Sequence, residues 1–384
     1  MKILFFIGSL GNGGKERRLV ELLTYLKEKK DYEVVLLLAF NQIDYPQFYN
    51  LNIDYIDLQK KTNSKDIRLF LKIHHIIKQY KPDIIHTWGS MQTFYMIPSA
   101  IIQHMPLINS QITDAPPKLR LNFFSKFVNA CNFRFASIIL ANSKAGLRAY
   151  GMHASTKSKV IYNGINLNRF TNFPEKETIK EKYQIQTKYT VVMSASFSLN
   201  KDYQRFYKVA SYVTSKNRDI TFIGVGAVVN NNPDYDRLVK LAKKNNQILF
   251  PGPITDVEAL VNACDIGVLF STQGEGISNA ILEYMALGKA AIVDECGGTP
   301  EYIKEGENGF FTTNRSIEEV GDLIIDLINK PEERKRIGNN AIKTIQTMFT
   351  LEQMGKEFEM LYRNVLENKK ILIFKRLFEK GSTS

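Results

Sequence analysis

Two glutamates in the stretch STQGEGISNAILEYMALGKAAIV, residues 271–293, lie eight positions apart. Gly276 and Ser278 are turn residues, so we expect Glu275 in a loop and Glu283 on the helix that follows. At 1.5 Å per residue, Glu283 lies roughly 7 Å along that helix. An ionised carboxylate only accepts hydrogen bonds, which suits a vicinal diol. The pair indicates a ligand with a sugar at each end, and a solvated helix with incidental glutamates is the alternative.

The start of the same helix offers backbone amides to an anion. Amides near Ser278, Asn279 and Ala280 have no partner inside a helix and point along the positive end of its dipole. A diphosphate bound there would bring an attached ribose to Glu283 and a sugar to Glu275. The pattern therefore predicts a nucleotide sugar as the ligand.

A glycine loop, GSLGNGG at residues 8–14, follows the apolar run KILFFIG and precedes a helical pattern. It is not a dinucleotide fingerprint, because the third glycine would fall on Glu16, and it lacks the Walker spacing. Gly13 and Gly14 could still bring amides close to a phosphate or sugar at a helix start. A plain strand-to-helix turn is the alternative.

Short apolar strands alternate with helical segments along the whole chain, which is typical of parallel doubly wound sheets. We predict an α/β protein with two facing Rossmann-like domains, and the cleft between them as the ligand site. The expected limits are a first domain at 1–165, a linker region at 166–188 and a second domain at 189–361. A last helix, at about 362–384, could pack back on the first domain.

Composition excludes several classes of protein. The chain has 384 residues, 44% hydrophobic and 23% charged, as in globular proteins. It has no apolar run of about 18 residues and no cleavage pattern at its start, so we expect a cytoplasmic protein. Neither Cys131, Cys264 and Cys296 nor the five histidines show metal-ligand spacing. We therefore expect no bound metal.

The formal net charge is +12, which indicates an anionic partner. A phosphorylated ligand and an acidic membrane face both fit that charge. We find no signature of a nucleic-acid-binding module and expect no nucleic acid as a partner.

The stretch EGISNAILEYMALGKAAIVDECGGTPEYIKEGENGF resembles the E-x7-E signature of the family-4 retaining glycosyltransferases, which have the GT-B fold of two Rossmann-like domains. The resemblance covers most of the chain. Other similar stretches, in order, are LGNGGKERRLVELL, KPDIIHTWG, SIILANSKA, VIYNGINLNRF and ACDIGVLFST.

The resemblance implies roles for individual residues. Glu275 matches the glutamate that contacts the donor sugar, and Glu283 matches the one that contacts the ribose. In SASFSLNKDYQRF, residues 194–206, Lys201 matches a lysine that neutralises the donor diphosphate. The family arginine five positions earlier falls on Ser196, which is a departure, and Arg205 is a possible substitute. The predicted catalytic residues are Glu275 and Lys201, and the predicted donor-binding residues are Gly13, Gly14, Ser196, Lys201, Gly276, Ile277, Ser278, Asn279 and Glu283.

A second departure lies in NSQITDAP, residues 109–116, where many family members carry a histidine. Gln111 and Asp114 are the nearest polar candidates on the acceptor side. His86, at the end of the strand in KPDIIHTWG, is either an acceptor-side residue or a structural one.

The resemblance also implies the chemistry: metal-independent transfer of a hexose with retention, and no cofactor besides a UDP- or GDP-linked sugar donor. The acceptor would be a surface polysaccharide or a lipid-linked glycan. The stretch KKILIFKRLFEKGSTS has five Lys or Arg against one Glu, with Ile371, Phe374, Leu377 and Phe378 at helical spacing. It could lie on the acidic inner face of the cell membrane as a peripheral contact. The alternative is that this last helix packs back across the first domain.

Two rival functions remain open at this point. A catalytically silent GT-B subunit that binds glycans or a partner would explain Ser196 and the missing histidine. A GT-B sugar-nucleotide epimerase shares the architecture but is not expected to keep the two glutamates.

Overall fold

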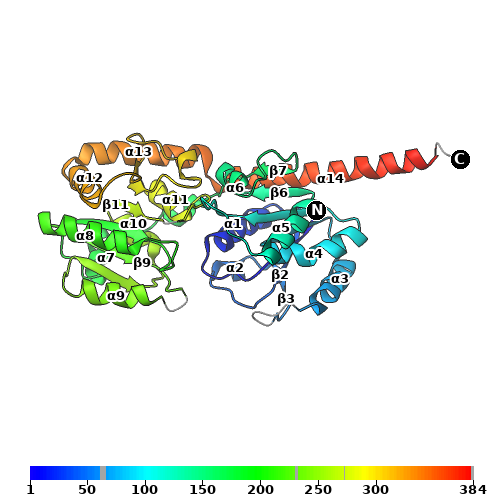
Figure 1. The fold of residues 1–384 in the computed structure, drawn as a ribbon, viewed down its shortest axis with the longest axis horizontal. Coiled ribbons are helices and arrows are strands. Elements are labelled where there is room, and N and C mark those ends of the chain that lie inside the picture. Colours follow the sequence, from blue (N-terminus) through cyan, green and yellow to red (C-terminus); the bar gives the residue numbers. More distant parts are fainter. Residues whose placement is uncertain (61–65, 230–231, 272, 382–384) are drawn as a thin grey trace. The chain divides into compact units, whose positions relative to one another are not determined.

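The computed structural model describes residues 1–60, 66–229, 232–271 and 273–381. The chain forms two compact units, each built around its own parallel sheet (Figure 1). Unit 1 contains residues 1–113, 118–164 and the chain from Leu351 onward, and unit 2 contains residues 114–117 and 165–350. The prediction of two Rossmann-like α/β domains is confirmed.

The sheet of unit 1 has the strand order β3-β2-β1-β4-β5-β6-β7, and neighbouring strands run parallel. Strands buried on both faces need continuous apolar runs, such as FFI in β1 and LLL in β2. The strands are β1 (Lys2–Ile7), β2 (Glu33–Leu38), β3 (Asp54–Asp57), β4 (Ile84–Trp88), β5 (Leu107–Ile112), β6 (Ile138–Ala141) and β7 (Ser158–Val160). The helices are α1 (Gly14–Glu28), α2 (Gln47–Asn50), α3 (Arg68–Tyr80), α4 (Ser90–Ile102), α5 (Phe123–Phe135), α6 (Lys144–Ala149) and α14 (Leu351–Gly381).

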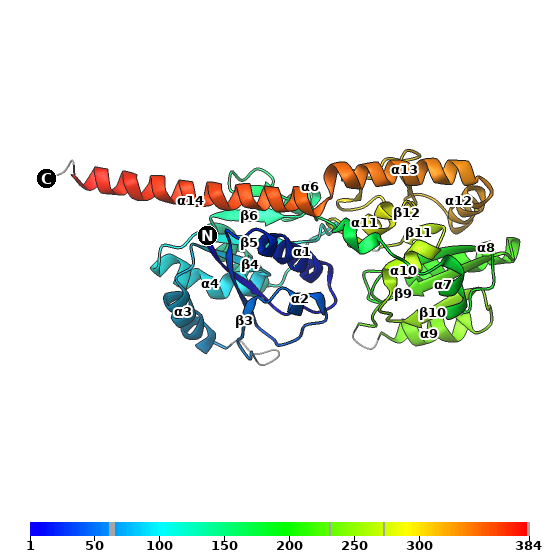
Figure 2. The ribbon, with the colours of Figure 1, turned by 180° about the vertical axis from the view of Figure 1, so that it is seen from behind.

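Two apolar clusters cover opposite faces of this sheet. One joins side chains of α1 and α14 to the strands, and the other joins those of α3 and α4 to the strands. Figure 2 labels these four helices. Helix α14 approaches α1 closely, because a Cβ atom on Gly355 would lie 2.4 Å from the ring of Tyr25. The Tyr25 and Tyr32 hydroxyls donate to Glu359 at 3.0 and 3.1 Å. These contacts make α14 part of unit 1.

Helix α14 begins at Leu351 rather than near residue 362, so it is longer than the sequence indicated. The side chains of Ile371, Phe374, Leu377 and Phe378 lie outside the described residues, so the predicted membrane contact of this end stays a prediction. In the part of the chain that the structure describes, no helix combines the length and the apolar character needed to cross a bilayer.

The sheet of unit 2 has the strand order β10-β9-β8-β11-β12-β13, again with parallel neighbours. The strands are β8 (Tyr189–Ser194), β9 (Ile220–Val225), β10 (Ile248–Gly252), β11 (Ile266–Leu269), β12 (Ala290–Val293) and β13 (Phe310–Phe311). The helices are η1 (Leu167–Phe170), α7 (Lys176–Lys182), α8 (Tyr203–Lys216), α9 (Pro233–Ala242), α10 (Val257–Ala263), α11 (Asn279–Ala286), η2 (Thr299–Glu301), α12 (Ile317–Asn329) and α13 (Pro331–Met348).

The segment predicted as a linker, residues 166–188, is instead part of unit 2. Helix α7 packs on α10, and Ile179 and Ile185 are buried. The segment is anchored to the start of α10, since Lys182 Nζ and the Tyr183 hydroxyl donate to the carboxylate of Asp256 at 2.7 and 2.6 Å. The domain therefore begins at residue 165.

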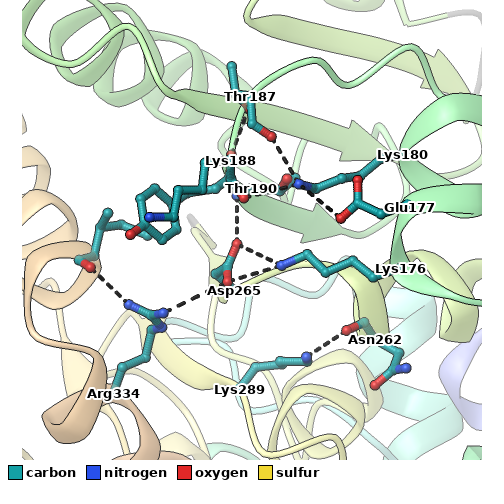
Figure 3. Close-up of polar contacts among 12 residues, drawn as sticks. Lys176, Glu177, Lys180, Thr187, Lys188, Thr190, Asn262, Asp265, Lys289 and Arg334 are labelled. Carbon is teal, nitrogen blue, oxygen red and sulfur yellow. Dashed lines mark hydrogen bonds and ion pairs between the residues drawn. The ribbon is translucent and has the colours of Figure 1, made fainter.

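A second carboxylate-centred contact holds the same segment to the sheet (Figure 3). Asp265 accepts from the Thr190 amide at 2.9 Å and pairs with Lys176 at 3.3 Å. Arg334, at 3.9 Å from Asp265, also donates to the carbonyl of Leu327 in the last turn of α12. Charged side chains thus cap helix ends and strand starts on this side of unit 2.

Candidate active site

The two residues predicted to be catalytic meet in unit 2, beyond the carboxyl ends of β8 and β11. Lys201 Nζ forms an ion pair with Glu275 Oε1. The backbones of Lys201 and Ser271 form an isolated antiparallel bridge, and Ser271 Oγ lies 3.2 Å from Glu275 Oε1. The Lys201 and Glu275 side chains are 12% and 24% exposed. The pair is therefore partly buried but open to an incoming ligand.

Close backbone contacts hold the loop that carries Glu275. The Ala115 amide donates to the Gly274 carbonyl at 3.0 Å, and the Gly298 amide donates to the Glu275 carbonyl at 2.8 Å. A Cβ atom on Gly274 would lie 1.7 Å from the oxygen of Ala115, and one on Gly297, with φ of +58°, would lie 1.9 Å from the oxygen of Glu275. Only glycine fits at these two positions.

Asp294, just after β12, ties this loop to α8. Its carboxylate accepts from the Ser271 amide at 2.7 Å and from Arg205 Nη1 at 2.8 Å. Arg205 also donates to the Thr312 carbonyl at 2.9 Å and lies 5.1 Å from the centre of the Phe270 ring. These contacts hold the Arg205 guanidinium beside Asp294, and its role as a substitute for the family arginine stays a prediction.

Ser196 occupies the position of that arginine, directly after β8. Its hydroxyl donates to Ser198 Oγ at 3.3 Å. The neighbouring backbone is crowded, since a Cβ on Gly226 would lie 1.9 Å from the Ala195 oxygen. Ser196 supplies a hydroxyl but no positive charge, so Lys201 is the cation that this loop contributes.

Glu283 lies on α11 and is 5% exposed. Its carboxylate is 3.3 Å from Arg169 Nη2, and the same arginine pairs with Glu258 on α10. Arg169 was not among the predicted site residues. A carboxylate expected in a buried helix face needs a cation, but nothing in the spacing pointed to Arg169, more than a hundred residues away.

The start of α11 is fixed by its neighbours. Ile277 and Ser278 are buried, and Ser278 occupies the N-cap position without a capping bond from its side chain. The Tyr284 hydroxyl accepts from the Ser194 amide at 2.7 Å, which joins α11 to the end of β8. Burial raises the pKa of Tyr284, so the hydroxyl stays protonated. The predicted donor-binding residues of this stretch lie between Glu275 and the first residue of α11, which is Asn279. They are Gly276, Ile277, Ser278 and Asn279.

The thiol of Cys296 lies close to this region. Burial, followed by the charge of Asp294, raises the pKa of Cys296 to about 11, so its thiol is protonated at neutral pH and is a poor nucleophile. No cluster of three metal-ligating side chains occurs within residues 1–60, 66–229, 232–271 and 273–381.

A cavity of about 140 Å³ lies beside Lys201. The stacked rings of Phe197 and Tyr203, with centres 3.8 Å apart, and the edge of Tyr235 belong to its wall. The volume fits one ring or one phosphate group, but not a whole nucleotide sugar. The cavity is lined by Phe197, Ser198, Leu199, Lys201, Asp202, Tyr203, Gln204, Asn232, Asp234, Tyr235 and Leu238.

The glycine loop predicted to bind the donor lies in unit 1. Gly13 is the N-cap of α1, and Gly14 is the first residue of that helix. The Tyr45 hydroxyl donates to the Gly13 carbonyl at 2.9 Å, and the Arg17 amide donates to the same oxygen at 3.0 Å. The loop is a well-held strand-to-helix turn, and its contact with a donor stays a prediction.

The three acceptor-side candidates lie in different surroundings. His86 is fully buried, with Nδ1 2.9 Å from the Tyr362 hydroxyl and Nε2 2.6 Å from Ser110 Oγ. Burial and then Arg18 lower its pKa well below the usual value. His86 is therefore better described as a structural residue, because both of its ring nitrogens are bonded within the fold and its ring packs against Phe358 and Tyr362 of α14.

Gln111 is half-buried and bonded to the side chains of Asn129 and Asn132 at 2.8 and 2.6 Å. Asp114 is exposed, and its backbone forms an isolated bridge with Glu275. Of the three candidates, Asp114 is the one that the structure brings to Glu275.

The fold places the protein in a class that known structures share. Alr3699/HepE of Anabaena, solved in complex with UDP and glucose, superposes with a TM-score of 0.82 at 22% identity, over 94% of this chain and 99% of that one. The WaaG glycosyltransferase involved in lipopolysaccharide biosynthesis gives a TM-score of 0.71 at 14% identity, over 93% and 99%. These likenesses show the GT-B fold.

Two family models match consecutive parts of the chain, Glycosyltransferase Family 4 over residues 12–169 and Glycosyl transferases group 1 over residues 175–344. The chain therefore belongs to the family-4, group 1 glycosyltransferases, as the sequence resemblance predicted.

Curated relatives agree with this family. The uncharacterized glycosyltransferase MJ1069 of Methanocaldococcus jannaschii is 29% identical over 259 residues, 64% of this chain and 62% of the relative. The N,N'-diacetylbacillosaminyl-diphospho-undecaprenol alpha-1,3-N-acetylgalactosaminyltransferase of Campylobacter jejuni is 26% identical over 248 residues, 63% of this chain and 60% of the relative. The chain thus matches about three fifths of the length of these relatives.

Proposed function

We propose that the protein transfers a hexose from a UDP- or GDP-linked sugar to a surface-polysaccharide or lipid-linked glycan acceptor, with retention and without a metal ion or other cofactor. The observation that carries the proposal is the meeting of Lys201 and Glu275 beside the start of α11. A cation, helix amides and a carboxylate converge there. A nucleotide sugar offers a complementary diphosphate and diol.

The proposed step needs position and charge rather than a nucleophile. The bond between the anomeric carbon and the diphosphate oxygen breaks, and its electron pair leaves with the nucleotide. The acceptor hydroxyl oxygen bonds to the same face of that carbon, and its proton passes to the leaving phosphate. Lys201 and the amides before α11 would stabilise the charge that develops on the diphosphate, and Glu275 would orient the sugar.

The solved and curated relatives support the donor and acceptor classes. The Anabaena protein has been solved with UDP-glucose. The Campylobacter relative is named for an acceptor on diphospho-undecaprenol. A carrier of that kind would bring the protein to the inner face of the cell membrane, and the basic C-terminal stretch of the chain is compatible with such a contact.

A catalytically silent subunit is the second candidate. One observation favours it: the neutral side chain of Ser196 stands where the family has an arginine. A single lysine beside the diphosphate would then hold a nucleotide without driving the departure of the leaving group.

Nucleotide release tests the proposal. The pure protein is incubated with UDP- and GDP-sugars in the presence of EDTA, with and without a pool of glycan acceptors, and the anomeric configuration of any product is read by NMR. We expect acceptor-dependent release that Glu275→Ala and Lys201→Ala abolish and that Lys216→Ala, a change at an exposed ion pair, leaves intact.

Three results would contradict the proposal. Glycan binding without turnover favours the silent subunit, and interconversion of the sugar without transfer favours an epimerase. Activity that EDTA abolishes contradicts metal independence.

A further inference from the structure

One guanidinium nitrogen in unit 2 bridges carboxylates on two neighbouring helices. Arg169 Nη2 pairs with Glu258 Oε1 in the first turn of α10 and lies 3.3 Å from Glu283 Oε1 on α11. A terminal guanidinium nitrogen carries two N–H groups, so it can donate one to each carboxylate. The three side chains thus form one cluster, here called the Arg169 bridge.

The two carboxylates of the Arg169 bridge differ in their access to solvent. The side chain of Glu258 is 22% exposed, whereas that of Glu283 is 7% exposed. Two carboxylates that share one nitrogen repel each other when the cation is removed. Glu258 could then turn toward water, but Glu283 would remain as a buried charge that has lost its cation. Loss of Arg169 should therefore act mainly on Glu283.

The position of Arg169 is fixed by its own short helix, η1. The Arg169 amide donates to the Asn166 carbonyl at 3.1 Å, and the Asn166 side chain accepts from the Asn168 amide at 3.0 Å. The guanidinium carbon lies 5.3 Å from the centre of the Phe170 ring. Because backbone bonds and a neighbouring ring hold the arginine, its guanidinium presents a fixed donor to Glu283.

A fixed donor matters for the ligand predicted at Glu283. A carboxylate accepts from both hydroxyls of a ribose only when its oxygens point along the directions of those O–H bonds. A glutamate that is free to change rotamer must be ordered when the ligand binds, at a cost of roughly 0.5 to 1.5 kcal/mol. The Arg169 bridge orders Glu283 in advance.

We propose that Arg169 is a positioning residue, which holds the Glu283 carboxylate in the orientation that accepts the ribose hydroxyls of the donor nucleotide. The bridge thereby sets the preference of the site for ribose over deoxyribose. Arg169 acts through Glu283 and not through contact with the nucleotide. The inference rests on the proposed function, because it takes the ligand to be a nucleotide-linked sugar.

Calorimetric titration of the full chain measures this preference without an acceptor. UDP and GDP are each compared with dUDP and dGDP, their deoxyribose analogues. The wild type should bind the ribonucleotide at least about tenfold more tightly, as expected for one hydrogen bond to a charged acceptor. Arg169→Met should reduce the ratio to about twofold or less. An unchanged ratio would overturn the positioning role.

A double-variant cycle tests whether Arg169 acts through Glu283. In a Glu283→Gln background, Arg169→Met should cause no further loss of affinity for UDP or GDP, because the group that it positions has already changed. Equal losses in the Glu283→Gln and wild-type backgrounds would overturn the proposal by giving Arg169 an independent effect.

Lys182→Met is the matched control for loss of a tether between this segment and α10. Lys182 pairs with Asp256 at 2.7 Å rather than with Glu283, and its side chain is 54% exposed. This variant should keep the full preference for ribose. Thermal melting checks that all variants are folded, and an equal loss of preference in Lys182→Met would reduce Arg169 to a tether.

Transfer kinetics separate this inference from the proposed function. Arg169→Met should raise the donor KM about tenfold and change kcat less than about twofold, since ribose is held alike before and during transfer. A lower kcat with an unchanged KM would contradict positioning. If the wild type transfers sugar and Arg169→Met keeps the ribose preference, the positioning role fails and the proposed function stands. If the variant loses the preference but the wild type transfers no sugar, the proposed function fails and the positioning role stands.

Discussion

Replacing Glu275 by glutamine should strengthen the binding of free nucleoside diphosphate while it weakens sugar transfer. The carboxylate of Glu275 forms an ion pair with Lys201, so a diphosphate must compete with it for the cation. Glutamine keeps the size of the side chain and a polar group near Ser271 Oγ, but removes the charge.

The magnitude follows from the burial of the pair. Exposed ion pairs contribute about 0.2 to 1 kcal/mol, and the 12% and 24% exposure of these side chains puts the pair near the upper end of that range. Removal of the competing charge should therefore lower the Kd for UDP or GDP about fivefold. A donor sugar that is bound without the orienting carboxylate of Glu275 should react about a hundredfold more slowly.

Isothermal titration of UDP and GDP measures the first effect, and steady-state transfer measures the second. Asp322→Asn is the matched control, because it removes one negative charge from an exposed pair with Lys216 elsewhere in unit 2. Lys201→Met should raise the Kd about tenfold. An unchanged or higher Kd in Glu275→Gln would refute the competition between carboxylate and diphosphate.

Three further predictions concern the packing around the site and the core of unit 1. Gly274→Ala should lower kcat/KM at least about tenfold, because the added Cβ, 1.7 Å from the Ala115 oxygen, must shift the Glu275 loop; unaltered kinetics would mean that the loop adjusts freely. Cys296 should resist iodoacetamide at pH 8 in the folded protein, since its pKa is raised to about 11, and rapid alkylation measured by mass spectrometry would contradict this burial. The free energy of unfolding should fall as the pH drops below about 6.5, by up to about 1.4 kcal/mol per pH unit, because the unfolded chain protonates His86 and the folded protein does not. Denaturant titrations at several pH values should give a smaller slope of unfolding free energy against pH in His86→Gln than in the wild type. Equal slopes would mean that His86 takes up its proton in the folded state.

Much of the fold follows from the sequence because its determinants are local. Continuous apolar strands that alternate with helical segments require parallel sheets covered on both faces, and two such series require two domains. The loop position of Glu275 and the helix position of Glu283 also follow from turn residues and helical spacing alone. The family resemblance added Lys201, which the structure brings to Glu275.

The tertiary structure alone decided which charges pair. Arg169 reaches Glu283, Arg205 reaches Asp294, and the charged segment at 166–188 folds against unit 2. The sequence also left His86 open between two roles, and packing beneath α14 decided that it is structural. The spacing of apolar residues indicates which face of a helix or strand is buried. A buried charge instead pairs with whichever opposite charge the fold brings close, and the two can be far apart in the sequence.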